Sequence, residues 1–292
     1  MIFKGSGVAI CTPFNSSGVN YDTFERLIQL HLDEGTDALV VCGTTGEPST
    51  MTTKEKCGTI KFAVQQVNGK IPVIAGVGGN NTADVLESAK RAQDCGADAI
   101  LAVTPYYNKC SKSGLRKHFL ALADTTDLPI VIYNVPSRTA VNMDAQTFCE
   151  LAEHKNIAAV KEASADISQI ADYARLCRGK ADLYSGNDDH IVPLLSLGGI
   201  GVISVLANIM PRYTHDMVMA FLEGDVAKAR DMQLEVNPLV SALFCEVNPI
   251  PVKTALGLMG YDMGEFRLPL CEMEPQNVEK LKTEMDKLGL LK

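Results

Sequence analysis

The sequence lacks several features that mark membrane, metal-binding and nucleic-acid-binding proteins. No apolar stretch reaches the roughly 18 to 20 residues that a bilayer-spanning helix needs. The five histidines are scattered, and none lies at ligand spacing from another. The net charge of -8 gives no basic surface for a phosphate backbone. We therefore expect no membrane, metal or nucleic-acid partner.

The cysteine pattern lacks the signatures of disulfide and zinc proteins. The nine cysteines are an odd number in a long chain, and no Cys-x2-Cys pair occurs. We expect reduced thiols, with Cys11 and Cys42 acting as small hydrophobic residues inside apolar runs. Residues 1–14 carry one lysine and show none of the regions of a signal peptide, so we expect a cytoplasmic protein.

Strand-like and helix-like segments alternate along the chain. Solidly apolar runs, typical of parallel strands buried on both faces, recur at residues 8–13, 38–42, 72–77, 99–104, 129–134, 157–161, 181–185 and 199–205. Helical periodicity separates them at residues 22–34, 53–66, 82–95, 114–124, 144–153, 167–177 and 189–197. An open doubly wound sheet would more often have about five to seven strands and a phosphate-binding glycine pattern after the first. Because that pattern is missing, the alternation predicts an α/β fold, the (β/α)8 TIM barrel.

The strand signal stops near residue 223. Beyond it, residues 225–243, 249–259 and 277–288 show helical patterns separated by glycine and proline. We therefore expect a catalytic barrel over residues 1–224 and a C-terminal helical region over residues 225–292.

The active site of such a barrel lies at the carboxyl ends of the strands, and the sixth apolar run ends in Lys161. Burial lowers the pKa of an amine, and a neutral amine is the nucleophile that forms an imine with a ketone. Residue type alone favours the alternative, an ammonium group that reaches solvent or pairs with Glu162. The neighbouring strand ends decide how Lys161 is interpreted.

Those neighbouring ends carry hydroxyl and guanidinium groups. Tyr133 ends the fifth run and could exchange protons with a carbinolamine, or could be an ordinary buried phenol. Thr44 and Thr45 lie in a glycine-bracketed turn that suits a carboxylate or a helix N-cap. Arg138 could hold a second carboxylate or be a solvated surface residue. The segment at residues 187–190 is interpreted as a helix cap and not as a metal site.

At these positions the sequence resembles the dihydrodipicolinate synthase and N-acetylneuraminate lyase family of class I aldolases, over essentially the whole chain. The motifs that carry the resemblance are GTTGE from residue 43, VTPYYNK from 103, YNVPSRT from 133, KEAS from 161, GVISV from 201 and NPIPVK from 248. The resemblance implies that the chain condenses pyruvate with L-aspartate 4-semialdehyde to give 4-hydroxy-tetrahydrodipicolinate, the first committed step towards diaminopimelate and lysine. It also implies that no metal or organic cofactor takes part.

The resemblance assigns a role to each site residue. Lys161 would carry the imine, Tyr133 would donate and accept protons, and Thr44 and Tyr107 would continue the proton relay. Tyr107 would come from an adjacent subunit, so the chain would act as a tight dimer or as a homotetramer. The substrate-binding residues would be Thr45, Arg138, Gly186 and, through its backbone, Ile203.

Three alternatives predict different residues. A lyase for N-acetylneuraminate or for a 2-keto-3-deoxy sugar acid would have smaller polar residues after the fourth and fifth strands, where this chain has Tyr106, Tyr107 and Arg138. A metal-dependent class II aldolase would need a cluster of histidine and acidic ligands. An inactive barrel that acts as a binding protein would show damage to the catalytic set, and none is visible.

Lysine-inhibited members of the family resemble one another at an effector pocket. It maps to Pro48, Ser49, Thr53, Lys56, Asn80, Asp84 and Tyr106. Histidine is typical at the position of Lys56, and glutamate at that of Asp84. Because Lys56 would place a cation where the cation of the ligand must approach, we expect lysine feedback to be weak or absent.

Overall fold

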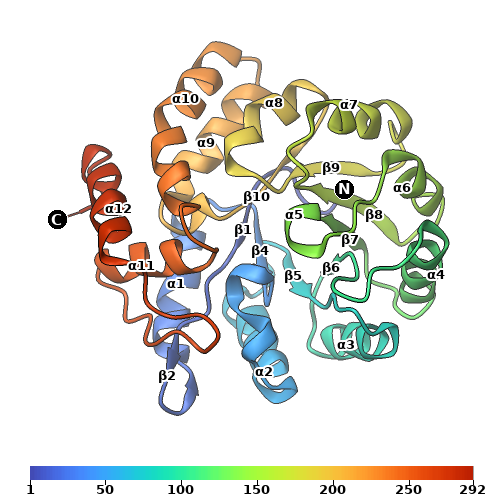
Figure 1. Cartoon of the computed structure of the whole chain (residues 1–292), viewed down its shortest axis with the longest axis horizontal. Coiled ribbons are helices and arrows are strands. Elements are labelled where there is room, and N and C mark those ends of the chain that lie inside the picture. The colour runs from blue at the N-terminus through green and yellow to red at the C-terminus, as the bar shows by residue number, and fades with distance from the viewer. Residues whose placement is uncertain (292) are drawn as a thin grey trace.

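A computed structural model describes residues 1–291 and contains a closed barrel of parallel strands (Figure 1). Consecutive strands are neighbours, and β10 pairs with β1 to close the ring. The strands are β1 (Gly5–Ala9), β4 (Ala38–Val41), β5 (Val73–Gly76), β6 (Ala99–Val103), β7 (Ile130–Asn134), β8 (Ile157–Glu162), β9 (Asp182–Ser185) and β10 (Gly201–Ser204). The predicted (β/α)8 barrel is confirmed.

Helices surround the strands in Figure 1, and several begin at capping side chains. Asn20, Thr52 and Ser111 each accept a hydrogen bond from a backbone N–H of the first turn, which satisfies a donor that the helix itself leaves free. The outer helices are α1 (Tyr21–Asp33), α2 (Thr53–Val67), α3 (Thr82–Asp94), α4 (Lys112–Ala123), α6 (Ala145–Leu151), α7 (Ile167–Leu176), α8 (Ile191–Ser196) and α9 (Pro211–Leu222).

Short elements connect several strands to the helices that follow. They are the hairpin of β2 (Phe14–Asn15) and β3 (Gly18–Val19), the 3-10 turns η1 (Thr44–Gly46), η2 (Pro48–Thr50), η3 (Asp188–His190) and η4 (Leu206–Asn208), and the single-turn helix α5 (Pro136–Thr139). Most follow a strand directly, so they lie at the carboxyl ends of the strands, where a barrel carries its site.

The C-terminal part of the chain is helical, as the sequence predicts. It contains α10 (Val226–Leu243), α11 (Ile250–Leu258) and α12 (Pro275–Lys287). Figure 1 shows them together on one side of the barrel, beside α1. The division of the chain at residue 225 stays a prediction.

The first strand begins earlier than the sequence predicts. Residues 8–13 carry the apolar pattern, whereas β1 runs from Gly5 to Ala9. Its first residues include Gly5 and Gly7, which interrupt the apolar pattern. Packing requires these glycines: a Cβ on Gly7 would lie 2.8 Å from a ring atom of Phe3, and one on Gly5 would lie 2.0 Å from an Asp37 oxygen. The apolar pattern therefore misses the start of β1, because close packing there has room only for glycine, which has no apolar side chain.

The barrel has two buried layers. Ile74, Ala159 and Ile203 fill its interior, while residues such as Leu39 and Phe119 pack between the strands and the helices. Strands buried on both faces explain the continuous apolar runs of the sequence. Each fully buried large side chain contributes about 1.5–3 kcal/mol, so this double core holds the strand ends firmly in place.

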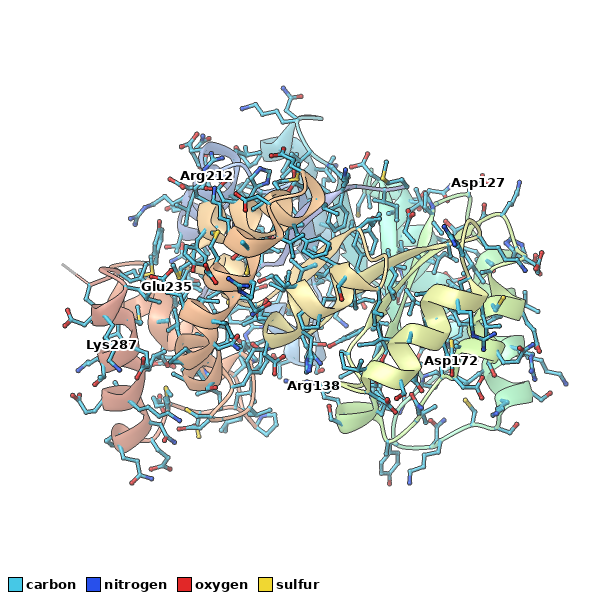
Figure 2. The ribbon with its side chains drawn as sticks, turned by 90° about the horizontal axis from the view of Figure 1, so that it is seen from above. Asp127, Arg138, Asp172, Arg212, Glu235 and Lys287 are labelled. Atoms are coloured by element: carbon cyan, nitrogen blue, oxygen red, sulfur yellow. The ribbon has the colours of Figure 1, made fainter. Side chains whose placement is uncertain are left out.

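The two ends of the barrel are distinct. Asp127 precedes β7 and Arg138 follows it, and in Figure 2 Asp127 lies near the top of the molecule and Arg138 in its lower half. The face that carries Arg138 is therefore the carboxyl-end face, where the predicted site residues are expected to meet.

Candidate active site

Lys161 and Tyr133 lie directly opposite each other on neighbouring strands. The register of β7 and β8 pairs them, and Nζ of Lys161 is 4.3 Å from the centroid of the Tyr133 ring. Both side chains point into the barrel, because Tyr133 packs in the interior cluster with Ala159 and Ala163, which flank Lys161 on the same face of β8. The amine and the phenol that the sequence singles out are thus neighbours.

Lys161 is enclosed, with 4% of its surface exposed. Burial lowers its pKa to about 8, while nearby Asp188 acts to raise it and Arg138 acts to lower it further. Glu162 faces away from the barrel interior, and its carboxylate accepts hydrogen bonds from Asn134 and from the backbone of Ser164. The alternatives of a solvent-reaching lysine and of a pair with Glu162 are therefore wrong.

The phenol of Tyr133 remains protonated near neutral pH. Burial raises the pKa of Tyr133 to about 12, and the guanidinium of Arg138 opposes that rise. A protonated phenol beside a partly neutral amine can donate a proton to an oxygen that leaves the carbon attached to Lys161.

The two threonines occupy η1, which begins directly beyond β4. No side chain caps this turn, so the N-cap alternative for Thr44 and Thr45 is wrong. Thr45 is buried, and its Oγ1 accepts a hydrogen bond of 3.0 Å from Nδ2 of Asn248. Thr44 is half-buried and lines the cavity described below. The turn therefore presents one hydroxyl to the cavity and fixes the other through the C-terminal region.

Arg138 lies on α5 and reaches across the barrel mouth. Its Nη2 donates a hydrogen bond of 3.0 Å to the carbonyl of Asn248. Arg138 also lines the cavity, where a carboxylate could accept two of its remaining N–H groups. Gly186 closes the site on the β9 side: a Cβ there would lie 3.1 Å from Cε of Lys161. Only glycine leaves the lysine side chain this much room.

These residues surround a cavity of about 300 Å³. Its lining includes Thr44, Thr45, Tyr133, Arg138, Lys161, Gly186 and Asn248. A cavity of this size accommodates small organic acids. Six of the eight predicted site residues therefore meet at one place.

The other two predicted residues lie elsewhere. Ile203 is buried in the barrel interior, in the same cluster as Tyr133, and lines neither cavity of this region in the described chain. Tyr107 is 89% exposed, has a φ of 68° and lies in the loop between β6 and α4. Tyr107 is thus directed towards solvent in the single chain.

Asp188 is a site residue that the sequence interpretation missed. Its carboxylate is buried, and accepts hydrogen bonds from Oγ of Ser204 at 2.6 Å and from the backbone N–H groups of Val205 and Leu206. No side chain caps η3 or α8, so the helix-cap interpretation of residues 187–190 is wrong. Its position three residues after the end of β9 was the available signal, because that place is where barrels carry their sites.

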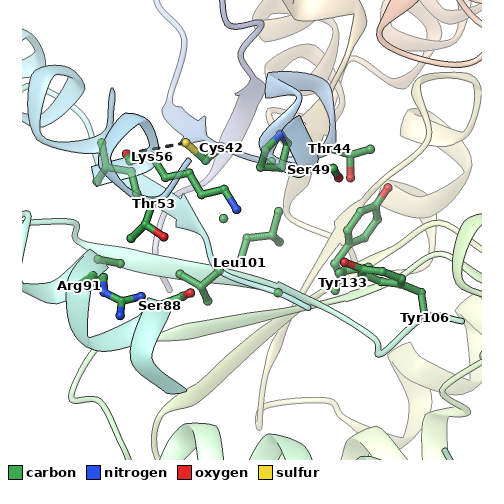
Figure 3. A pocket seen from close by; sticks show the side chains of 18 of the residues that line it. Cys42, Thr44, Ser49, Thr53, Lys56, Ser88, Arg91, Leu101, Tyr106 and Tyr133 are labelled. Carbon is green, nitrogen blue, oxygen red and sulfur yellow. Dashed lines mark hydrogen bonds between the residues drawn. The ribbon is translucent and has the colours of Figure 1, made fainter. Parts of the chain in front are cut away.

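A second cavity, of about 290 Å³, adjoins the first and shares Thr44, Tyr133 and Arg138 with it. Figure 3 shows Thr44, Tyr133 and Tyr106 at one end and Lys56, Ser88 and Arg91 at the other. Five of the residues expected at an effector pocket line it: Pro48, Ser49, Thr53, Lys56 and Tyr106. Asn80 and Asp84 do not, and the Asp84 carboxylate accepts from Nδ2 of Asn81. The cation of Lys56 thus lies where the sequence places it.

Within residues 1–291, no group of three or more His, Cys, Asp or Glu side chains is arranged to hold a metal ion. None of the helices in that part of the chain is long and apolar enough to cross a membrane. Cys11 and Cys42 are buried as expected, and burial raises the pKa of the Cys42 thiol to about 12.

Known proteins resemble this chain along its whole length. The model of the dihydrodipicolinate synthetase family matches residues 2–288. A 4-hydroxy-tetrahydrodipicolinate synthase of Thermoanaerobacter sp. (strain X514) is 57% identical over 292 residues, which cover 100% of this chain and 98% of the relative. The solved structure of dihydrodipicolinate synthase from Thermotoga maritima is 42% identical, with a TM-score of 0.98 and full coverage of both chains.

A second solved structure, described as the first monomeric dihydrodipicolinate synthase variant, is 41% identical to this chain. Its TM-score is 0.98, and the match covers 99% of this chain and 98% of that one. Since both the sequence and the fold match over nearly every residue, the chain belongs to the dihydrodipicolinate synthetase family.

Proposed function

We propose that this chain condenses pyruvate with L-aspartate 4-semialdehyde to give 4-hydroxy-tetrahydrodipicolinate, through an imine on Lys161. The observation that carries the proposal is the buried pair of Lys161 and Tyr133. Nζ of Lys161 lies 4.3 Å from the centroid of the Tyr133 ring, and both residues line a cavity that suits small acids. The activity is that of the curated relatives. The residue roles below are inferred from the geometry.

The first step forms the imine. The neutral amine of Lys161 attacks the ketone carbon of pyruvate and gives a carbinolamine, whose hydroxyl leaves as water after it takes a proton from Tyr133. Of the two protons that this oxygen needs, the first comes from the attacking nitrogen through Tyr133 and Thr44, and the second comes from Tyr133 itself. Loss of water therefore leaves a protonated imine and a Tyr133 phenolate. A pKa near 8 leaves about a tenth of Lys161 neutral at pH 7, which is enough to start the reaction.

The second stage forms the carbon–carbon bond. The protonated imine draws electrons from the methyl group, which loses a proton to the Tyr133 phenolate and becomes an enamine carbon. Tyr133 then holds the proton that the aldehyde oxygen needs in the next step. That carbon attacks the aldehyde of the second substrate, whose oxygen takes up a proton. The amine of the semialdehyde then attacks the imine carbon and displaces Lys161, so the ring closes and the enzyme is restored. The balance is one water released, with no oxidant, metal or cofactor consumed.

Two groups on the cavity wall suit the carboxylates of the substrates. The η1 turn, with Thr44 and Thr45, offers hydroxyl and backbone donors to pyruvate. Arg138, on the opposite side, can hold the carboxylate of the semialdehyde in a bidentate contact. An acceptor with a long polyol chain has no carboxylate at that point, so Arg138 supports the synthase over the sugar-acid lyases.

Assembly completes the site. Tyr107 is exposed in the single chain, and we infer that it enters the site of an adjacent subunit as the last member of the relay. This role predicts a dimer at least, and a homotetramer if two such dimers associate. One solved relative is described as the first monomeric dihydrodipicolinate synthase variant, so assembly of this chain needs its own measurement.

Reductive trapping tests the proposal. Borohydride in the presence of pyruvate should leave a reduced pyruvyl group on Lys161, identified by peptide mass analysis, and Lys161→Ala should abolish it. An adduct on another lysine, or none, would overturn the imine mechanism. A coupled assay that offers aspartate semialdehyde and N-acetylmannosamine as acceptors should show turnover with the semialdehyde alone.

A further inference from the structure

The turn that carries Thr44 is fixed from outside the barrel. Glu47 follows η1 with a φ of 56°, in the left-handed region that residues other than glycine rarely adopt. Its Oε1 lies 2.9 Å from Nζ of Lys253, and both side chains are 1% exposed. Oε2 of Glu47 is buried and has no hydrogen-bond partner among the residues that the structure describes. The chain thus keeps a charged pair where burial is costly.

Stability alone does not account for such a pair. A buried ion pair is often no better for stability than well-packed apolar side chains, because desolvation offsets the attraction. Lys253 is nevertheless enclosed on several sides. It donates a hydrogen bond of 3.0 Å to the carbonyl of Glu265, and its Nζ lies 4.7 Å and 4.9 Å from the ring centroids of Phe14 and Phe266. This enclosure holds the ammonium in one place, and with it the carboxylate of Glu47.

The same segment of α11 and the residues before it contact the turn at a second point. Nδ2 of Asn248 donates to Oγ1 of Thr45 at 3.0 Å, and the carbonyl of Asn248 accepts from Arg138. Residues 248–253 therefore fix the turn on both sides of Gly46, at Thr45 and at Glu47. These residues are the NPIPVK motif, to which the proposed reaction gives no role of its own.

Thr44 depends on this attachment. The backbone N–H of Glu47 donates to the carbonyl of Thr44 at 3.2 Å, so the conformation at Glu47 closes the turn that begins with Thr44. Thr44 must keep its hydroxyl near Tyr133 if it is to pass a proton. Lys161 stands on β8 and does not contact the Glu47–Lys253 pair, so its position does not depend on η1.

We propose that Lys253 and Glu47 form a positioning pair, which holds η1 so that Thr44 stays aligned with Tyr133. This inference rests on the proposed function. The pair acts on the rate of proton transfer and on turnover; without it the covalent adduct on Lys161 still forms completely, but more slowly. The C-terminal helices thereby contribute to catalysis without touching the substrate.

The decisive variant is Lys253→Met, assayed together with Glu47→Gln and the double variant. We expect kcat of Lys253→Met to fall on the order of tenfold to a hundredfold, as small misplacements of catalytic groups do, while KM for pyruvate changes less than about threefold. Borohydride should still label Lys161 to completion. The double variant should lose no more kcat than the worse single variant, because both residues act through one contact.

Tyr213→Phe is the matched control. It removes the hydrogen bonds of Tyr213 to the carbonyl of Met232 and to Glu235, between α9 and α10, without touching η1. Its kcat should match that of the parent even if its Tm falls.

A folded Lys253→Met protein with kcat within twofold of the parent would overturn the positioning role, and so would effects that multiply in the double variant. If Lys253→Met does not fold, Glu47→Gln decides, since it keeps the size of the side chain: unchanged kcat would overturn the role. Failure of the parent itself to label on Lys161 would count against the proposed function and not against the positioning pair.

Discussion

Tyr133 and Lys161 face each other across β7 and β8, with the amine nitrogen 4.3 Å from the centre of the phenol ring. Each belongs to a strand that is hydrogen-bonded on both sides within a closed barrel. A shift of either strand by one residue would turn its side chain to the opposite face. The distance between the nucleophile and its proton donor is therefore set by the register of the barrel.

The pH dependence of imine formation should follow Lys161. Burial lowers its pKa to about 8, and only the neutral amine attacks the ketone. The neutral fraction rises about tenfold between pH 6 and pH 7, so the trapping rate should rise likewise and level off above about pH 9. Initial rates of borohydride trapping with pyruvate, measured by mass spectrometry from pH 6 to 10, check this. A midpoint near the ordinary lysine value of 10.5 would contradict it.

Removing the phenol should slow turnover without unfolding the protein. Tyr133→Phe keeps the ring, and general acid–base groups contribute about a hundredfold to ten-thousandfold, so we expect kcat to fall within that range. Tyr173→Phe is the control, because Tyr173 is also buried but donates to the carbonyl of Met143, away from the cavity. Its kcat should be unchanged while the free energy of unfolding falls by about 1 kcal/mol. Equal losses of kcat in both variants would remove the catalytic role of Tyr133.

The space beside Lys161 should tolerate no side chain at residue 186. A Cβ on Gly186 would meet Cβ of Ala163 at 2.7 Å and Cε of Lys161 at 3.1 Å. Gly186→Ala should therefore displace the lysine and lower the trapping rate on the order of tenfold or more. Gly257→Ala is the control, since nothing lies within 4 Å of that position and the added methyl should stabilise α11 by about 0.5–1 kcal/mol. Normal trapping by Gly186→Ala would show that the lysine can adjust.

Subunit mixing should reveal whether Tyr107 acts across an interface. Tyr107→Phe and Lys161→Ala should each be nearly inactive alone. A mixed dimer combines the native Lys161 of one subunit with the native Tyr107 of the other, so unfolding and refolding the two variants together should recover about a quarter of the parental activity. That figure follows from random pairing, in which half of the dimers are mixed and each has one intact site. No recovery, in a mixture that does form dimers, would place Tyr107 outside the partner's site.

Lysine should inhibit this protein weakly or not at all. Lys56 lines the second cavity and places a cation where the cation of the ligand would have to approach. Initial rates at mildly alkaline pH should therefore be unchanged by low-millimolar L-lysine. Lys56→His removes most of that charge above pH 7 and is the comparison variant. Substantial inhibition of the parent at those concentrations would reject the prediction.

The barrel and the central pair of the site could be predicted from the residues alone. Continuous apolar runs and helical periodicity are local patterns, and the residue that ends each run is known once the run is recognised. In a barrel those ends meet at one face, so Lys161, Tyr133, Thr44 and Arg138 could be placed together without coordinates. The family motifs then named the chemistry.

The surroundings of that pair could not be predicted in this way, because they depend on contacts between distant parts of the chain. Glu47 and Lys253 are separated by 206 residues, and Thr45 and Asn248 by 203, so no local pattern joins them. Asp188 resembles a helix cap in sequence, because a polar residue before a helix fits both roles, and only the fold directs its carboxylate to β10. Burial is likewise a property of the assembled layers. The sequence left open whether Lys161 is a nucleophile or a solvated charge. In the folded chain its amine is enclosed, and burial lowers its pKa to about 8.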